Sequence, residues 1–340
     1  MSLLQLTSDL ISIENAPTFP RLTFRSFRGE SDYPAIAAVQ SASEAADSIE
    51  EVITVEQVAN EFAHPENCDP YQDTLLAEAN DQTVGFARMF WRINDAGERI
   101  FWQFGYVSPG WRRKGIGRAL LQFTEGRARA HAQTSPFAGP NYLRGVGEGL
   151  AHSKIALFEN AGYQIERYFF FMGRKALHDR PNAPLPAGFE YRPAQLADLR
   201  AIWNAKEEAF RDHWGYSQKS ETVYQNWVND PRHDLSQWLV AWDTEQNEIA
   251  GLSINGINED DNKQFRFKRG WVYTLGVRRP YRGRGLARAM LVRGFENFRE
   301  HGMTEVVLAV DAENPTGALG LYESVGFEVL DRDRLYRKKL

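Results

Sequence analysis

The sequence of 340 residues contains a single cysteine, Cys68, so no disulfide bond can form within the chain. It contains no run of about 18 apolar residues, the length that a membrane-spanning helix needs. Basic residues are not in excess: the formal net charge is −5 at pH 7, which disfavours nucleic acid as a bulk electrostatic partner. The seven histidines show no close pairing of the kind that zinc sites use, so we expect no metal.

The N-terminal residues also lack the features of an export signal. Residues 1–20 have no basic region at their start and include Asp9 and Glu14. Apolar residues make up 43% of the chain and charged residues 25%, values typical of soluble globular domains. We therefore expect a cytoplasmic protein without a membrane partner. The length predicts two domains of about 100–200 residues each.

What the sequence does contain is a basic, glycine-rich segment that occurs twice. The first copy follows the strand-like residues 100–107 and contains Arg112-Arg113-Lys114-Gly115-Ile116-Gly117-Arg118. The second follows residues 271–277 and contains Arg282-Gly283-Arg284-Gly285-Leu286-Ala287-Arg288. The two copies lie 170 residues apart, half of the chain, which predicts an internal duplication.

Each copy joins a predicted strand to a predicted helix, because apolar residues recur at helical spacing after both segments. The free backbone N–H groups at a helix start bind anions, and glycine lets the backbone approach a ligand closely. Arginine side chains add paired donors. This combination indicates a phosphate-binding loop. A nucleic-acid patch is the alternative for residues 278–284, and the acidic composition disfavours it.

The order of predicted elements divides the chain. We expect an N-terminal extension over residues 1–19, a first domain over 20–176, a proline-containing linker over 177–188 and a second domain over 189–340. Each domain shows the same succession of strand, helix, strand pair and strand entering the loop. The predicted fold class is α/β (α+β), with a mixed, mostly antiparallel central sheet flanked by helices in each domain.

A second motif in the C-terminal half identifies a family. Residues 310–327 include Asp311-Ala312-Glu313-Asn314, then Leu321-Tyr322 and Gly326-Phe327. Together with the two loops, this pattern resembles the GCN5-related N-acetyltransferase (GNAT) family. The resemblance covers nearly the whole chain as two units, which is the arrangement of mycothiol synthase-like tandem acetyltransferases.

The resemblance implies an N-acetyltransferase that uses acetyl-CoA as donor and the primary amine of a small molecule as acceptor. It implies that the backbone of Leu275, Gly276 and Val277 pairs with the pantetheine arm and that Asn314 contacts the same arm. It also implies that Tyr322 protonates the departing thiolate; packing of its ring in the core is the alternative. The pyrophosphate would be bound by Arg282, Gly283, Arg284, Gly285, Leu286, Ala287 and Arg288.

The first half departs from the family pattern. Phe158 takes the place of Tyr322 and has no hydroxyl, and residues 145–149 replace the Asp-x-x-Asn element. We therefore predict a catalytically silent first domain. Two roles stay open for it, CoA binding or packing alone. The residues for CoA binding would be Gly105, Tyr106, Val107, Arg112, Arg113, Lys114, Gly115, Ile116, Gly117 and Arg118.

The motifs do not fix the general base. In mycothiol synthase-like enzymes an acidic residue on the strand entering the loop is expected to take the proton of the amine, and Trp271 stands there in this sequence. This departure argues against mycothiol synthase activity itself. Asp212 and His213 are the candidates that remain, with Asp311 a weaker one. Histidine titrates near neutrality, which suits a base.

Other functions remain open at this point. The enzyme could use a different acyl donor or acetylate a peptide N-terminus. A non-catalytic acyl-CoA sensor would lack any need for Tyr322, and a structural dimerisation protein would not bind CoA at all. The sequence fixes neither the acceptor amine nor the choice between a monomer and a homodimer.

Overall fold

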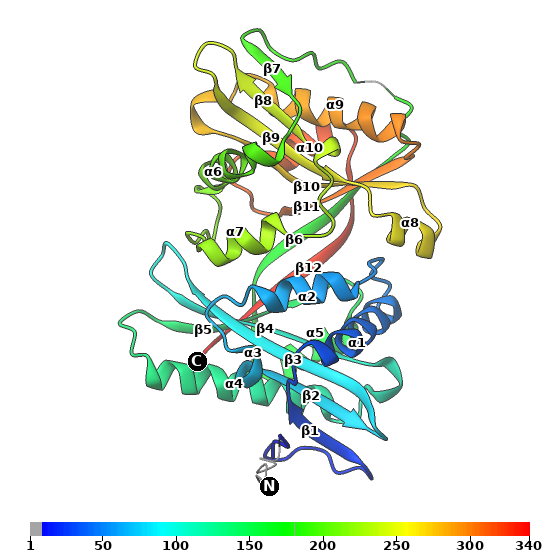
Figure 1. The fold of residues 1–340 in the computed structure, drawn as a ribbon, viewed down its shortest axis with the longest axis vertical. Helices are drawn as coiled ribbons and strands as arrows, with labels where there is room; N and C mark the ends of the chain where they lie inside the picture. The colour runs from blue at the N-terminus through cyan, green and yellow to red at the C-terminus, as the bar shows by residue number, and fades with distance from the viewer. Residues whose placement is uncertain (1–8, 180) are drawn as a thin grey trace, which may run out of the picture. The chain divides into compact units, whose positions relative to one another are not determined.

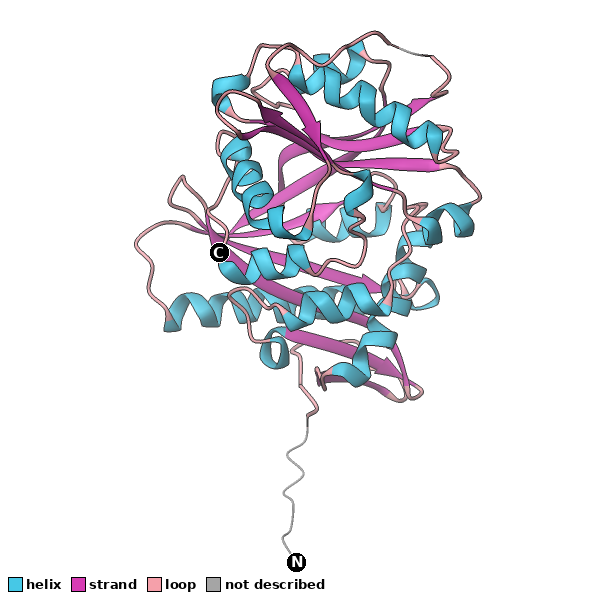
Figure 2. Cartoon of the chain, turned by 45° about the horizontal axis from the view of Figure 1, so that its top comes forward, coloured by secondary structure: helices cyan, strands magenta, loops and turns pink. Residues whose placement is uncertain are grey.

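The computed structural model describes residues 9–179 and 181–340, and these form two compact units. The first unit contains the described residues up to Glu166 together with Leu335–Leu340, and the second contains Arg167–Arg334. Figures 1 and 2 show the helices and strands of both units. No helix in the described part combines the length and the apolar character that crossing a bilayer requires.

The sheet of the first unit has the strand order β1-β2-β3-β4-β5, with β4 and β5 parallel and the other pairs antiparallel. Its strands are β1 (Leu22–Ser26), β2 (Thr74–Ala79), β3 (Gln82–Ile93), β4 (Arg99–Val107) and β5 (Asn141–Gly147). Its α-helices are α1 (Tyr33–Ala46), α2 (Val55–Ala63), α3 (Pro70–Asp73), α4 (Ile116–Thr134) and α5 (His152–Asn160).

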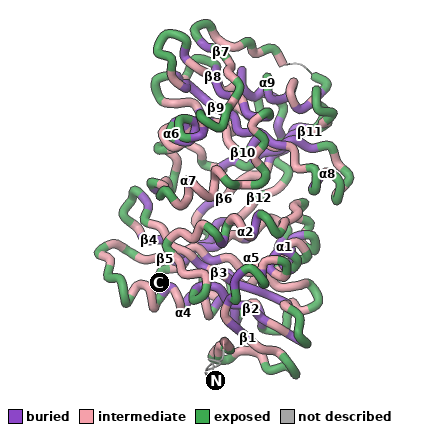
Figure 3. The backbone as a smooth tube through the Cα atoms, viewed as in Figure 1, coloured by how far each residue is buried: buried purple, intermediate pink, exposed green. Residues whose placement is uncertain are grey.

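Different helices cover the two faces of this sheet, because neighbouring residues of a strand point to opposite faces. Leu75 packs in one cluster with Ile116 of α4, whereas Leu76 packs in another with Ile36 of α1 and Val58 of α2. Both leucines are fully buried. Figure 3 shows that β2 and β3 contain buried segments.

The second unit repeats this architecture in the strand order β6-β11-β10-β9-β8-β7, with β10 and β11 parallel. Its strands are β6 (Gln164–Lys175, from Arg167 on), β7 (Phe189–Arg192), β8 (Leu239–Asp243), β9 (Glu248–Gly256), β10 (Arg269–Val277), β11 (Glu305–Asp311) and β12 (Glu328–Lys339, up to Arg334). Its α-helices are α6 (Leu199–Phe210), α7 (Glu221–Val228), α8 (Glu259–Phe265), α9 (Leu286–Glu300) and α10 (Ala318–Ser324).

The faces of the second sheet are also covered separately. Val240 packs with Ile202 of α6, and its neighbour Ala241 packs with Leu286 and Met290 of α9. The prediction of a mixed, mostly antiparallel sheet flanked by helices is confirmed for both units. The periodicity of the sequence indicated the strands and helices, and the sheet arrangement was what the family resemblance implied.

The strand that enters the loop differs between the units. In the first unit β4 pairs with β3 without interruption, from Val107 opposite Gly85 to Arg99 opposite Ile93. In the second unit the pairing of β10 with β9 shifts between Val272 and Thr274. Such a shift is a β-bulge, which bends a strand and redirects side chains.

The structure divides the chain elsewhere than at the predicted linker. The second unit includes β6 from Arg167 on, because Phe169–Lys175 pair with β11. Leu177, at the start of the predicted linker, is buried in the core of the second unit. Residues Leu335–Leu340, predicted to end the second domain, belong to the first unit. Local sequence patterns do not specify strand partners that lie far apart in the chain.

The predicted N-terminal extension is described from residue 9 on. Leu10 forms an isolated bridge with Arg25, and the Ile11 N–H donates to the Phe24 carbonyl at 2.8 Å. Ile11 and Ile13 pack against the core of the first unit. Residues 1–8 of the extension lie outside the described residues.

Candidate functional site

Both loops connect the end of a strand to the start of a helix, as the spacing predicted. In the first unit β4 ends at Val107 and α4 begins at Ile116; in the second β10 ends at Val277 and α9 begins at Leu286. The helices are preceded by Gly115 and Gly285, whose φ angles of 85° and 83° lie in the left-handed region. Glycine adopts this conformation without strain, so the backbone N–H groups of the first helical turn are left facing the loop.

Arg112 and Arg282 brace their loops against helices from earlier in each unit, α1 and α6. In the second unit Arg282 donates from Nε to the Val277 carbonyl at 3.1 Å and from Nη1 to Asp212 at 2.8 Å. Its Nη2 donates to the Ala209 carbonyl at 2.9 Å, next to the end of α6. These contacts occupy the guanidinium, so the side chain fixes the shape of the loop.

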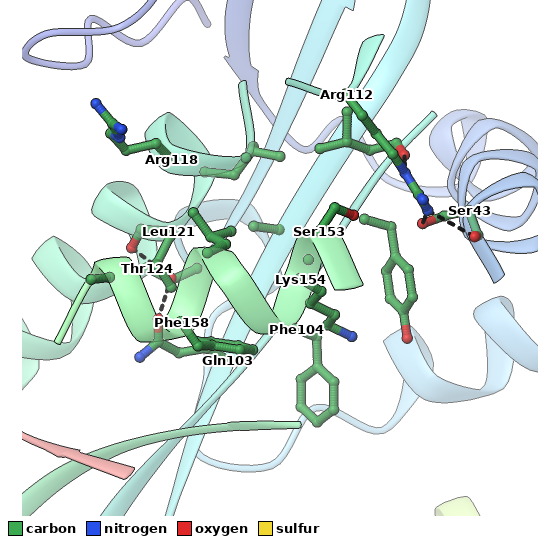
Figure 4. Close-up of a pocket in the computed structure, with 18 of the residues that line it drawn as sticks. Ser43, Gln103, Phe104, Arg112, Arg118, Leu121, Thr124, Ser153, Lys154 and Phe158 are labelled. Carbon is green, nitrogen blue, oxygen red and sulfur yellow. Dashed lines mark hydrogen bonds between the residues drawn. The ribbon is translucent and has the colours of Figure 1, made fainter. Parts of the chain in front are cut away.

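The first unit repeats this brace with the corresponding residues. Arg112 donates to the Val107 carbonyl at 3.3 Å, to Asp47 at 2.7 and 2.8 Å and to the Ser43 carbonyl at 2.8 Å. Figure 4 shows the Arg112 side chain directed at Ser43. Both arginines donate to the carbonyl of the strand-end valine, to a carbonyl near the end of a helix and to an aspartate, and these shared contacts align Ser43 with Ala209.

A cavity of about 240 Å³ in the second unit brings most of the predicted residues together. It combines the end of β10, the loop, the start of α10 and the two side chains His213 and Tyr322. The predicted residues that line it are Leu275, Gly276, Val277, Arg282, Gly283, Gly285, Leu286, Ala287, Arg288, His213 and Tyr322.

Three predicted residues of the second unit lie outside the lining of this cavity. Arg284 places its guanidinium 4.5 Å from the ring centroid of Phe189. Asn314 accepts hydrogen bonds from the backbone and hydroxyl of Thr316, at 2.8 and 2.6 Å, and so shapes the turn before α10. Asp212 forms ion pairs with Arg279 and Arg282.

Tyr322 has the properties of a proton donor. Its side chain is 8% exposed, it lines the cavity, and its ring packs edge-on against Phe327 at 5.8 Å. Burial raises the pKa of its hydroxyl to about 12. The hydroxyl therefore stays protonated at neutral pH, and no hydrogen bond within the described part of the chain occupies it.

His213 lines the same cavity and has the properties of a base. Its ring packs on Phe210, with the centroids 4.3 Å apart. Burial is the main cause that lowers its pKa below 6.5, and the positive charge of Arg282 adds to the effect. A lowered pKa keeps the imidazole neutral at pH 7, which is the form that accepts a proton.

The two carboxylates proposed as bases are engaged in ion pairs. Asp212 accepts from Arg282 and also from both Nε and Nη2 of Arg279, and these hydrogen bonds hold its pKa far below the usual range. Asp311 accepts from Nε of Arg167 at 2.7 Å. Asp212, held in this way, is a poor proton acceptor near neutral pH.

The first unit contains a larger cavity, of about 600 Å³, on its own loop (Figure 4). Phe158, which the sequence placed at the position of Tyr322, lines this cavity and stacks on Tyr336 at 5.4 Å. Lys114 donates to the Gly110 carbonyl outside the lining, and Ile116 is buried in the core. The predicted residues that line the cavity are Gly105, Tyr106, Val107, Arg112, Arg113, Gly115, Gly117 and Arg118.

Sequence reasoning missed a set of polar residues in the first cavity. Glu44 of α1 is 5% exposed, and Gln103 of β4 is buried with Thr124 of α4 donating to it at 2.7 Å. Glu148 and Lys154 form an ion pair at 2.9 Å on the same lining. One signal for Glu44 was available: it lies eight residues after Ile36, on the buried face of the helix.

Among the described residues, no group of three or more histidine, cysteine, aspartate or glutamate side chains is placed to hold a metal ion. The cavities instead combine the start of a helix with His213 and Tyr322 or, in the first unit, with buried carboxyl groups. That combination suits the binding of a phosphate-bearing ligand and the transfer of a proton.

Comparisons with known proteins agree with this chemistry. The acetyltransferase (GNAT) family model matches residues 199–327, and the acetyltransferase (GNAT) domain model matches residues 70–165. The mycothiol acetyltransferase of Thermobifida fusca is 31% identical over 68% of this chain and 72% of its own length. That of Salinispora tropica is 32% identical over 65% of this chain and 67% of its own length.

Solved structures extend the likeness to nearly the whole chain. A GCN5-related N-acetyltransferase from Sphaerobacter thermophilus has a TM-score of 0.67 and 30% identity, covering 95% of this chain and 97% of that chain. A tandem GNAT protein from the clavulanic acid biosynthesis pathway has a TM-score of 0.64 at 16% identity, covering 94% and 98%, and shares the fold. With two loops, two matched domains and these relatives, the chain belongs to the GNAT family and is an N-acetyltransferase of the tandem type.

Proposed function

We propose that the second unit transfers the acetyl group of acetyl-CoA to the primary amine of a small molecule. The observation that carries the proposal is the single cavity that joins the anion-binding loop to His213 and Tyr322. The relatives are named mycothiol acetyltransferases, and this name supports a small-molecule acceptor.

The residues of the cavity supply each proton transfer that the reaction needs. The neutral amine attacks the thioester carbonyl, the new C–N bond forms, and the C–S bond breaks. His213 takes the proton that the amine loses, and Tyr322 gives a proton to the departing thiolate. The backbone of Leu275–Val277 would hold the pantetheine arm, and the start of α9 would bind the pyrophosphate.

We propose that the first unit is silent in this tyrosine-assisted reaction. Phe158 lacks the hydroxyl and is packed between the rings of Tyr163 and Tyr336. Gly145 lies directly against the Phe158 ring, since a Cβ on Gly145 would come within 2.3 Å of it. The ring is therefore part of the core of this unit.

An aromatic surface beside the bulge of β10 supports a difference in acceptor from mycothiol synthase. Trp271 stacks on Tyr273 at 5.7 Å with the rings nearly parallel, and Phe171 packs on Trp271 at 5.5 Å. The Arg232 guanidinium lies 5.9 Å from the Tyr273 ring. Trp271 stands where a carboxylate would be expected, so we propose an acceptor amine with an apolar or aromatic part. Peptide N-termini and other acyl donors are the alternatives.

The test is CoA release from acetyl-CoA with pooled amines, namely amino acids, polyamines, aminoglycosides, amino sugars and short peptides. We expect acceptor-dependent release by the wild type and a decrease of at least about tenfold in Tyr322→Phe, since a lost general acid typically costs about 100-fold or more. The matched control is Tyr191→Phe, which removes a hydroxyl outside the cavity lining of the same unit. Equal release by Tyr322→Phe and wild type would refute the assignment of the acid.

A further inference from the structure

The cavity of the first unit contains a buried carboxyl group with an unsatisfied oxygen. Oε1 of Glu44 accepts a hydrogen bond from Nε2 of Gln40 at 2.9 Å, and Oε2 is buried without a hydrogen-bond partner. Glu44 lines the cavity beside Tyr106. Leaving a buried carboxyl oxygen unpaired costs free energy, so such a group indicates a ligand that supplies the missing partner.

The second unit has no polar group at the corresponding place. Ser43 corresponds to Ala209, because the carbonyl of each accepts a hydrogen bond from Nη2 of the loop arginine in its own unit. The residue that follows is Glu44 in the first unit and Phe210 in the second. Tyr106 corresponds to Gly276, the residue before the final valine of the strand, and a Cβ on Gly276 would lie 3.0 Å from the Phe210 ring. Gly276 and Phe210 thus form an apolar contact in the second unit, where the first unit has the polar residues Tyr106 and Glu44.

A cation also lines the first cavity. Lys154 of α5 donates to both carboxylate oxygens of Glu148, at 2.9 and 3.0 Å, and its Nζ is 4.7 Å from the Tyr106 ring centroid. It precedes Phe158 by one helical turn, so it lies on the same face of the helix as the residue that replaces the tyrosine. Figure 4 shows Lys154 and Phe158 along α5 in the cavity.

We propose that the first unit is a second acyl-transfer site with an acid–base pair of its own, in which Glu44 takes the proton of an acceptor amine and Lys154 protonates the departing thiolate. The inference rests on the proposed function for its donor, an acyl-CoA thioester. This pair replaces the roles that His213 and Tyr322 have in the second unit. Tyr106 lines the cavity with both groups, on the strand segment that precedes the loop.

The step balances without a further reactant. The amine nitrogen forms a bond to the thioester carbon, the C–S bond breaks, and the products are an amide and the CoA thiol. Glu44 gains one proton from the amine while the Lys154 ammonium loses one to the thiolate. Transfer of the proton from Glu44 to Lys154 through water restores both groups.

The protonation state of Glu44 suits this role. Burial raises the pKa of its carboxyl to about 7, against the smaller opposing effects of Gln40, Lys154 and Tyr106. A base whose pKa lies near the working pH is the most effective in general catalysis. Lys154 is positioned on the cavity lining by its ion pair with Glu148 at 2.9 Å.

The experiment uses the full chain with Tyr322→Phe, which suppresses the reaction of the second unit. Acceptor-dependent CoA release is measured with the amine pools for Tyr322→Phe alone and with Glu44→Gln, Lys154→Met or Glu50→Gln added. Glu50 is an exposed carboxylate close in sequence and serves as the matched control. Calorimetric titration with CoA checks that each protein still binds its ligand.

We expect residual release in Tyr322→Phe that falls at least tenfold with Glu44→Gln and with Lys154→Met but not with Glu50→Gln. Active wild type with no release in Tyr322→Phe would overturn the inference and leave the proposed function intact. Full release in Tyr322→Phe that Glu44→Gln abolishes would support the inference and refute the role of Tyr322. No release by wild type with any pool would contradict both proposals.

Discussion

At the scale of single residues, the two units place different chemical groups at matching positions. Tyr322 in the second unit corresponds to Phe158, and Glu44 in the first corresponds to Phe210. In both comparisons one unit has a titratable side chain where the other has a phenylalanine. The loop and its brace thus recur in both units, while these side chains differ.

A pH profile tests the role of His213. The proton acceptor must be neutral, and the pKa of His213 lies below 6.5 because of burial and Arg282. We therefore expect kcat/KM for the acceptor to stay constant near pH 7 and to fall as the pH drops through that lowered pKa. In His213→Gln this fall at low pH should disappear, and kcat/KM near pH 7 should be about 100-fold lower than in the wild type.

His301→Gln is the control for this profile, since His301 lies at the end of α9 and does not line the cavity. An unchanged acid limb in His213→Gln would assign the titration to another group.

How much the sequence reveals at this scale depends on how local the signal is. The left-handed glycines, Gly115 and Gly285, and the place of Tyr322 in its motif follow from short spacings, and the structure puts all three at the loops or the cavity. The engagement of Asp212 by Arg282 was not predictable, because the two residues are 70 apart. Only the docking of α6 beside the loop brings them together.

At the scale of elements, each loop is hydrogen-bonded to a helix, α1 or α6, that covers the sheet face opposite the helix which follows the loop. The arginine brace joins α1 to the first loop and α6 to the second. Because the donors and carbonyl acceptors recur in both, the brace is a feature of the fold. It fixes the backbone N–H groups that would receive a phosphate.

Asp212→Asn tests whether this residue acts on the loop or on the proton. Weakening its three charge-assisted hydrogen bonds loosens the loop, so we expect KM for acetyl-CoA to rise about three- to tenfold, with kcat changed by less than about threefold. A lost general base would instead lower kcat by about 100-fold or more at unchanged KM. Steady-state kinetics over a range of acetyl-CoA concentrations distinguish the two, with Asp260→Asn, an exposed carboxylate of α8, as control.

At the scale of the whole molecule, the first unit is not a contiguous piece of sequence, whereas the second is the single stretch Arg167–Arg334. The first unit takes in Leu335–Leu340, and the second begins at Arg167. Within the first unit Tyr336 is fully buried, stacks on Phe158 and donates from its hydroxyl to Glu159 at 3.0 Å. A repeat length of 170 residues reveals the duplication but not this assignment of strands, which depends on pairing between distant segments.

Tyr336→Ala tests how much the first unit depends on these residues. Removing a fully buried aromatic side chain costs about 3–5 kcal/mol, so we expect a clear drop in melting temperature. Hydrogen exchange should show lost protection in β5 and α5. The control is Tyr273→Ala, whose side chain is 37% exposed. Equal melting and exchange in the two variants would contradict the dependence.

The placement of Leu335–Leu340 also sets an order of events during synthesis. A ribosome delivers these residues only after every other residue of both units has been made. The first unit therefore cannot complete its core as soon as its own repeat has emerged, as a contiguous N-terminal domain does. In this tandem enzyme the half that is translated first is the half that finishes folding last.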